Sequence, residues 1–412
     1  MPRAAVLIGA LATALTLAGC ATASSSGSAG TGGTAATTTT PGTASGSAAA
    51  TSGSTATAAA STAAVPAGGP VPAGFAATSV TFVSTQEAFV LGTAPCSHAP
   101  CTSIVRTLDR GASWVGLPAP VVALGQPLNL TSAPAVWGIR FGTRAHGFVF
   151  GTGLWETTDG GEHWAQAAAP AGWILSLEVI DGQVLALVAD CTASNGCAQE
   201  GNLERRPLSG GPWQRVAPVR VTGATETTDL IATQARVAAV LDGSAVIVTG
   251  NGGLSITSHP TPCTTVGVAY AAAVAVTGPD SLALLCSGQG AMGSVGKTVY
   301  VSDNLGRSWT KAGTPPLGGD PIQLAAATPD QLIVSAASGA SWLYYSGDGA
   351  ARWDSAYEAG DGGAGFNDVG FTTTSDGVAV RAPVHTGNNA DDSPGQLLLT
   401  SNGGATWQLV TF

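Results

Sequence analysis

The stretch Thr157-Thr158-Asp159-Gly160-Gly161-Glu162-His163-Trp164 decides the fold, because versions of it recur until the chain ends. The shared pattern is Ser or Thr, any residue, Asp or Asn, any residue, Gly (Ala350 in one copy), two further residues and Trp. Five copies keep an acid or amide followed by Trp: Asp109 and Trp114, Asp159 and Trp164, Asn304 and Trp309, Asp348 and Trp353, and Asn402 and Trp407. Two degraded copies end at Trp213 and Ile256. The copies lie about 50 residues apart, a period typical of propellers and solenoids.

The residue types of the repeat are those of a tight turn. The Asp or Asn side chain accepts hydrogen bonds from backbone N–H groups, and the Ser or Thr hydroxyl makes a second side-chain-to-backbone bond. Gly supplies a positive φ that other residues resist. The Trp begins the next strand and fills space between neighbouring sheets. The motif therefore predicts a hairpin turn with a packing anchor, and no catalytic role for its acidic residues.

This pattern resembles the Asp-box, or BNR repeat, of sialidases, sortilin-type receptors and photosystem II stability/assembly factor-like proteins. The segment 139–151, Ile-Arg-Phe-Gly-Thr-Arg-Ala-His-Gly-Phe-Val-Phe-Gly, closely resembles the last group. The resemblance covers about residues 76–412 and implies an all-β fold, a seven-bladed β-propeller of four-stranded antiparallel blades. It implies little about function, because the motif occurs in enzymes, receptors and chaperone-like factors.

Each repeat is expected to hold four strands, A to D, from the centre outward. In the clearest blade, strands A, B and C are expected at 136–142, 147–151 and 154–158, with strand D opening at Trp164. Because the repeated turn joins C to D, all seven turns lie on one face, and the B–C and D–A connections lie on the other. Four B–C connections are long, and loops longer than a hairpin needs are often functional. They fall at about 92–103, 189–202, 287–297 and 382–395.

The N-terminus predicts an exported lipoprotein. A short basic start precedes an apolar run of about fifteen residues, which is too short to span a bilayer. The following Leu17-Ala18-Gly19-Cys20 resembles a bacterial lipobox, which implies a signal peptide at 1–19 and a Cys20 thiol carrying palmitate-type chains. The alternative is an ordinary secretory signal with an incidental cysteine. Residues 20–70, rich in Ala, Thr, Ser and Gly, indicate a disordered linker, and 71–412 form the propeller.

Six further cysteines fall in three close pairs: Cys96 and Cys101, Cys191 and Cys197, and Cys263 and Cys286. Six cysteines allow 15 connectivities. Proximity favours pairing of sequence neighbours, and export makes disulfides the expected state. None of the pairs has CxxC spacing, so a metal site is not expected.

Composition and missing motifs exclude several activities. The net charge of −10 argues against nucleic acid, which needs a basic surface. A sialidase would need three arginines for the substrate carboxylate and a Tyr nucleophile; the first blade offers only Arg106 and Arg110, and the five tyrosines do not match the family pattern. No G-x-S-x-G motif is present, and the five histidines are scattered. His163 lies within a copy of the repeated motif, so it is expected to take part in that turn and not to bind a ligand. A glycoside hydrolase nevertheless stays the alternative hypothesis.

Two sets of residues are candidates for binding. Residues 387–393, Gly-Asn-Asn-Ala-Asp-Asp-Ser, have oxygen ligands for calcium, although a solvated loop is favoured. Five residues are expected where inner strands begin, at the mouth of the central channel, where they would bind a sugar or peptide: Trp137, Trp173, Asp229, Asn367 and Asp368. For the two tryptophans, packing between blades is the favoured interpretation.

The sequence therefore predicts a lipid-anchored, extracytoplasmic, monomeric propeller that binds a protein or glycan partner without cofactor or catalysis. Two questions stay open. The copy ending at Trp213 lacks its Asp, so the third blade is in doubt, and residues 71–75 either add a strand to the last blade or do not.

Overall fold

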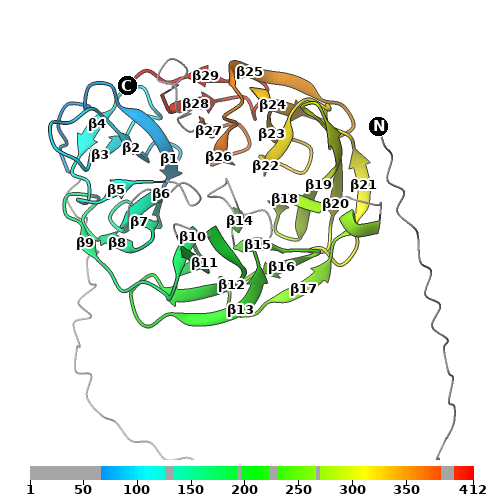
Figure 1. Cartoon of the computed structure of the whole chain (residues 1–412), viewed down its shortest axis with the longest axis horizontal. Coiled ribbons are helices and arrows are strands. Elements are labelled where there is room, and N and C mark those ends of the chain that lie inside the picture. The colour runs from blue at the N-terminus through cyan, green and yellow to red at the C-terminus, as the bar shows by residue number, and fades with distance from the viewer. Residues whose placement is uncertain are drawn as a thin grey trace, which may run out of the picture. The chain divides into compact units, whose positions relative to one another are not determined.

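The computed structural model describes residues 66–125, 134–192, 196–221, 231–234, 236–265, 270–381 and 394–412. These residues form seven antiparallel blades around a centre (Figure 1), which confirms the expected all-β propeller. The helical content of this part of the chain is one 3-10 turn, η1 (Pro262–Thr265). Within the same ranges, no helix has the length and apolar character needed to cross a membrane. Cys20, Asp229 and the 387–393 loop lie outside the described residues.

The blades follow one another along the chain. Blade 1 contains β1 (Ala76–Phe82), β2 (Ala88–Thr93), β3 (Thr102–Thr107) and β4 (Val115–Leu117). Blade 2 contains β5 (Ala123–Leu124), β6 (Ala135–Phe141), β7 (Gly147–Gly151), β8 (Leu154–Thr157) and β9 (Ala165–Gln166). Blade 3 contains β10 (Trp173–Ile180), β11 (Gln183–Thr192), β12 (Gly196–Pro207) and β13 (Gln214–Arg220). Blade 4 contains β14 (Ile231–Gln234), β15 (Val237–Asp242), β16 (Ala245–Thr249) and β17 (Thr257–Pro260).

The last three blades have the same order. Blade 5 contains β18 (Tyr270–Gly278), β19 (Ser281–Ala291), β20 (Ser294–Ser302) and β21 (Thr310–Gly313). Blade 6 contains β22 (Asp320–Ala326), β23 (Leu332–Ala337), β24 (Gly339–Ser346) and β25 (Asp354–Gly362). Blade 7 contains β26 (Asn367–Phe371), β27 (Gly377–Arg381), β28 (Gln396–Thr400) and β29 (Gln408–Leu409).

In every blade the strands pair in sequence order, with the first strand innermost and the last at the rim (Figure 1). The short β5 adds a parallel partner on the inner edge of β6. Blade 3, which the sequence left in doubt, is a complete four-stranded blade. We call the side that carries the turns between third and fourth strands the box face, and the side that carries the connections between second and third strands the loop face.

The repeated motif forms one hydrogen-bonded turn, which we call the box turn. In the copy that opens at Thr157, the Gly161 N–H donates to Thr157 Oγ1 at 3.0 Å, and the His163 N–H donates to Asp159 Oδ1 at 3.0 Å. The Thr157 hydroxyl donates in turn to Asp159 Oδ1 at 2.8 Å. The same three bonds recur in the copies that open at Thr107, Thr249, Ser302, Ser346 and Thr400.

The fifth position of the box turn requires a left-handed backbone. Gly161 has φ +88°, a conformation that costs other residues about 1–2 kcal/mol. Blade 6 places Ala350 there at φ +74°. Blade 4 keeps every bond of the turn although Ile256 replaces the Trp, so the turn forms without its aromatic anchor.

Five of the box turns are also tied to the first hairpin of their own blade. In blade 2 the Gly160 N–H donates to the Ala145 carbonyl at 2.9 Å. Equivalent bonds join Arg110 to Gln86, Leu305 to Asp280, Gly349 to Asp330 and Gly403 to Ser375. The two turns on the box face of a blade therefore hold each other in place.

The tryptophan after the box turn connects neighbouring blades. The indole N–H of Trp164 donates to the Pro118 carbonyl of blade 1 at 3.1 Å. Trp213 reaches Ala168 of blade 2 at 2.9 Å, and Trp309 reaches Pro260 of blade 4 at 3.3 Å. Trp353 and Trp407 donate instead to carbonyls of their own turns.

The hydrophobic core is divided among the blade interfaces, with one buried cluster between each pair of neighbours. The interface that closes the ring has the same construction: Val380 and Leu397 of blade 7 pack on Val90 of blade 1. Burial of about 25 cal/mol per Å² of apolar surface makes these clusters the main stabilising term.

The ring closes without a strand shared between the first and last blades. All four strands of blade 7 come from its own repeat, and Gly69 pairs with Gly116 at the outer edge of blade 1. The Phe412 ring lies 4.8 Å from that of Phe75 and 5.2 Å from that of Trp114. Residues 66–70, which the sequence assigned to the linker, thus contact the propeller.

We expect Thr157→Val to lower the free energy of unfolding by about 1–3 kcal/mol, because it leaves the buried Gly161 N–H without its acceptor while preserving side-chain shape. Chemical denaturation measures the loss. Thr310→Val on the exposed rim strand is the control and should stay within about 0.5 kcal/mol of the parent. Equal effects of the two substitutions would show that the hydroxyl does not hold the turn.

Candidate functional site

A cavity with a volume of about 720 Å³ lies at the centre of the ring. Innermost strands of several blades line it. One side of the wall is ionic and is contributed by Arg140, Glu178 and Asp368. The other side carries small side chains, the run Ala271-Ala272-Ala273 of β18. Tyr270 and Asp320 lie at its loop-face end, where β18 and β22 begin.

Arg140 is the centre of the ionic wall. Its Nε lies 2.6 Å from Glu178 Oε1 in blade 3, and its Nη2 lies 3.0 Å from Asp368 Oδ1 in blade 7. Nη1 donates to the Ile139 carbonyl at 2.9 Å and to Ser79 Oγ of blade 1 at 3.2 Å. One guanidinium therefore connects four blades. The Arg140 side chain is only 8% exposed, so this network is shielded from solvent.

Asp368 bridges the closing blades in a left-handed conformation, with φ +48°. Its Oδ2 accepts the Val80 N–H of β1 at 2.7 Å. Gln323 of blade 6 acts in the same way, because its Oε1 accepts the Val369 N–H of blade 7 at 2.8 Å. In blade 1, Ser79 Oγ accepts the Ile139 N–H of blade 2 at 3.3 Å. From blade 6 to blade 2, a side chain of each blade thus binds the inner edge of the next.

Burial and the Arg140 guanidinium act on the pKa of Glu178 in opposite directions. Burial raises the pKa of Glu178 above its ordinary value, while the nearby Arg140 opposes that rise. The two carboxylates of the ionic wall, Glu178 and Asp368, contact the same guanidinium. The wall therefore presents fixed, mutually bound charges.

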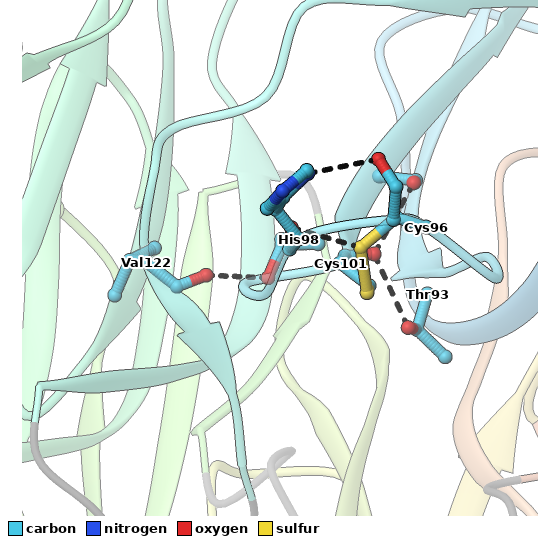
Figure 2. Close-up of a disulfide and its surroundings, with 8 residues drawn as sticks. Thr93, Cys96, His98, Cys101 and Val122 are labelled. Atoms are coloured by element: carbon cyan, nitrogen blue, oxygen red, sulfur yellow. Dashed lines mark hydrogen bonds between the residues drawn. A yellow bond between two sulfur atoms is a disulfide. The ribbon is translucent and has the colours of Figure 1, made fainter.

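Three disulfides lie toward the loop face, and each joins sequence neighbours as expected. Cys96–Cys101 closes the blade 1 connection (Figure 2), where Thr93 Oγ1 donates to the Cys101 carbonyl at 3.2 Å. Cys191–Cys197 joins paired positions of β11 and β12. Cys263–Cys286 ties η1 to β19. Such bridges fit an extracytoplasmic location.

The long loop-face connections differ in what the structure describes. Residues 92–103 and 287–297 are fully described, and the second is an extension of the β19–β20 hairpin. The connection 189–202 is described apart from 193–195, and it too is a strand hairpin. Most of 382–395 lies outside the described residues.

The structure separates the residues expected at the channel mouth. Asp368 lines the cavity. Trp137 does not: it is 1% exposed and packs in the core between blades 2 and 3, its ring 6.1 Å from that of half-buried Trp173. The cause is a β-bulge between Val136 and Gly138. Trp137 is the unpaired residue of this bulge, so its side chain points into the core between the blades and away from the central cavity. Packing between blades is thus the role that matches the position of Trp137.

Asn367 is half-buried at the start of β26 beside Asp368. Its Oδ1 is buried and has no hydrogen-bond partner among the described residues. Sequence reasoning missed Arg140, Glu178 and Gln323. The sequence does contain a signal for them, because each is a charged or amide residue inside an otherwise apolar inner strand. A polar side chain buried there needs a hydrogen-bond or ionic partner.

A group of possible metal ligands, Asp159, Glu162 and His163, lies on the box face with Glu162 and His163 exposed. His163 Nδ1 is 2.8 Å from Asp159 Oδ2, and this contact raises the pKa of His163. Together with the backbone bond from His163 to Asp159, it gives this histidine the turn role expected from the sequence.

Comparison with solved structures supports the propeller fold. The structure of YCF48 bound to D1 peptide matches with a TM-score of 0.51 and 16% identity, over 83% of this chain and 96% of that one. YCF48 from Cyanidioschyzon merolae matches with a TM-score of 0.50 and 15% identity, over 81% and 97%. The GH74 enzyme of Niastella koreensis, at a TM-score of 0.30 and 12% identity over 81% and 71%, is too dissimilar to support an inference.

At these identities the similarity establishes the fold and nothing more. No protein-family model and no curated protein matches this chain.

We expect Arg140→Met to lower the free energy of unfolding by about 3–5 kcal/mol, because it removes the cation that two buried carboxylates share. Denaturant titration measures the loss. Arg236→Met is the matched control: its 2.8 Å pair with Asp181 is exposed, and such pairs contribute about 1 kcal/mol or less. A loss at Arg140 no larger than at Arg236 would contradict a closing role for the network.

Proposed function

We propose that this protein is an extracytoplasmic, non-enzymatic scaffold that binds a partner protein through its loop face. The observation that carries the proposal is the concentration of all three disulfides toward that face. Box turns and their hairpin ties already hold the opposite face. Covalent bracing of extended connections preserves the shape of a surface, which lowers the entropic cost of binding.

Exposed apolar groups favour a protein partner. Tyr270, Met292 and Leu317 are 56%, 103% and 57% exposed, and all three belong to loop-face segments. Apolar and aromatic side chains of this kind are typical of protein interfaces. A glycan partner, which the sequence left open, is an alternative outcome of the tests below.

The ion pairs of Glu178 and Asp368 in the cavity wall support a non-enzymatic role. A glycosidase needs one carboxyl group as acid and a second as base or nucleophile. Glu178 and Asp368 are each bound to Arg140 and lie in a ring-closing network. Their positions are explained by the fold, without a reaction.

A capture experiment tests the scaffold. The tagged full-length chain, solubilised from the native envelope, should retain a defined set of proteins. A loop-face variant with His98→Ala, Glu200→Ala and Met292→Ser should lose them, because all three side chains are exposed on connections between second and third strands. The control variant carries Glu162→Ala, Arg307→Ala and Arg352→Ala on the box face and should retain them. Loss in the control alone, or in neither variant, would contradict the proposal.

We also propose that the protein is anchored by a lipid on Cys20, as the sequence Leu17-Ala18-Gly19-Cys20 suggests. Several acyl chains on one residue anchor stably, whereas a single chain does not. Cys20→Ser should abolish incorporation of radiolabelled palmitate and move the protein from the membrane to the soluble fraction. Membrane retention of the Cys20→Ser variant would point to an uncleaved signal or a bound partner.

A further inference from the structure

A second cavity opens beside the central one, on the loop face of blade 5. Its volume is about 300 Å³, and we call it the blade-5 groove. Its lining includes Tyr270, Ser287, Gly290, Met292 and Asp320. Tyr270 and Asp320 also line the central cavity, so the groove adjoins the cavity mouth.

The strand pairing is interrupted at the floor of the groove. β19 and β20 pair regularly up to Ser287 and Lys297, and the next pair is Gly290 with Val295. Gly288 and Gln289 therefore lie opposite a single residue, as in a β-bulge. A bulge takes backbone N–H and C=O groups out of the regular ladder. Main-chain groups at this position are suited to an extended peptide, which is recognised largely through its backbone.

Ser287 supplies a second polar group. Its side chain is 1% exposed and lines the groove, and its Oγ has no hydrogen-bond partner among the described residues. A buried hydroxyl without a partner costs about 1–3 kcal/mol. A ligand that bonds to Ser287 Oγ removes that cost on binding.

The wall of the groove is held rigidly by Lys297, which is 1% exposed. Its Nζ lies within hydrogen-bond distance, 2.8–3.2 Å, of four carbonyl oxygens, those of Val295, Pro316, Leu317 and Gly318, which share its three N–H donors. Burial lowers the pKa of Lys297 to about 8, so the amine stays largely protonated at neutral pH. This internal cation fixes the loop that carries Leu317.

The hairpin tip is bound to the same loop. The Val295 N–H donates to the Leu317 carbonyl at 2.9 Å, and the Gly319 N–H donates to the Gly293 carbonyl at 2.9 Å. Met292, at the tip, and Leu317 are therefore exposed on neighbouring segments. Because their backbones are fixed, these apolar groups are presented in a defined arrangement before any partner binds.

Among the described residues that line the groove, the one charged side chain is negative. Asp320 is exposed at the rim, and it takes part in no ion pair within 4.0 Å among the described residues. Lys297, whose pKa Asp320 raises, is buried against its carbonyl oxygens and is not exposed at the rim. An unpaired carboxylate beside apolar side chains favours a ligand with a cation next to an apolar group.

We propose that the blade-5 groove binds an extended segment of the partner protein in which an apolar side chain neighbours a lysine or arginine. The apolar side chain contacts Met292 and Leu317, and the cation pairs with Asp320. The segment's backbone bonds to the bulge and to Ser287. This inference rests on the proposed scaffold function, for which it names the recognition chemistry.

Selection from a random twelve-residue peptide library displayed on phage tests the groove directly. The full-length chain should enrich peptides that place Lys or Arg beside Leu, Met or an aromatic residue. Asp320→Lys should lose these peptides and select acidic ones, because it reverses the charge at the rim. Failure to enrich any peptide, or enrichment of the same peptides by Asp320→Lys, would overturn the proposal.

One enriched peptide, made synthetically, then gives affinities by fluorescence anisotropy. Asp320→Asn and Met292→Ser should each weaken binding about tenfold, as expected for loss of one polar or apolar contact. Asp280→Asn, an exposed aspartate on the box face of the same blade, should leave Kd unchanged. Thermal unfolding of each variant shows that the fold is retained.

The outcome is separable from that of the scaffold proposal. If the loop-face variant loses its captured proteins while Asp320→Lys and Met292→Ser bind the selected peptides normally, the groove assignment is wrong and the scaffold function stands. If neither the capture nor the peptide binding depends on the loop face, both proposals fail.

Discussion

The inner edge of each blade is the constraint on which the ring depends. The first strand of a blade pairs on one side only, so N–H groups on its other side need acceptors away from water. Asp368, Gln323 and Ser79 supply these acceptors across blade boundaries. Arg140 then links the acceptor chain to blade 3. Closure therefore needs no shared strand, because polar groups at the centre and Phe412 at the rim join blades 7 and 1.

The sequence predicts those features that depend on local chemistry. The spacing of Ser or Thr, Asp or Asn, and Gly specifies the box turn, and seven copies specify seven blades. Closeness along the chain likewise predicts the disulfides. Trp137 was expected at the channel mouth but lies in the core between blades. A one-residue bulge reverses the direction of its side chain, and such a bulge cannot be recognised in the hydrophobic pattern of the sequence. The partners of Arg140 lie 38 and 228 residues away, a pairing that one sequence does not reveal.

The two faces of the propeller are built by different means. On the box face, the same backbone hydrogen bond ties five box turns to the first hairpins of their blades, and the motif also varies at exposed positions such as Glu162 and Arg307. On the loop face the connections differ in length, and disulfides or the buried Lys297 replace the repeated bonds. The repeated turns of the box face thus support a loop face whose connections differ from blade to blade, as in other folds where function resides in loops.

The segment that precedes the first strand bears on the mechanics of the molecule. Arg106 binds the Pro66 carbonyl, Pro66 lies beside Gly160 of a box turn, and Gly69 pairs with Gly116 of β4. Pro66 therefore lies on the box-face side of the propeller. A force applied to the chain at Pro66 would first load the contacts of Arg106 and the Gly69–Gly116 pairing, so these contacts would yield before the blades themselves are strained.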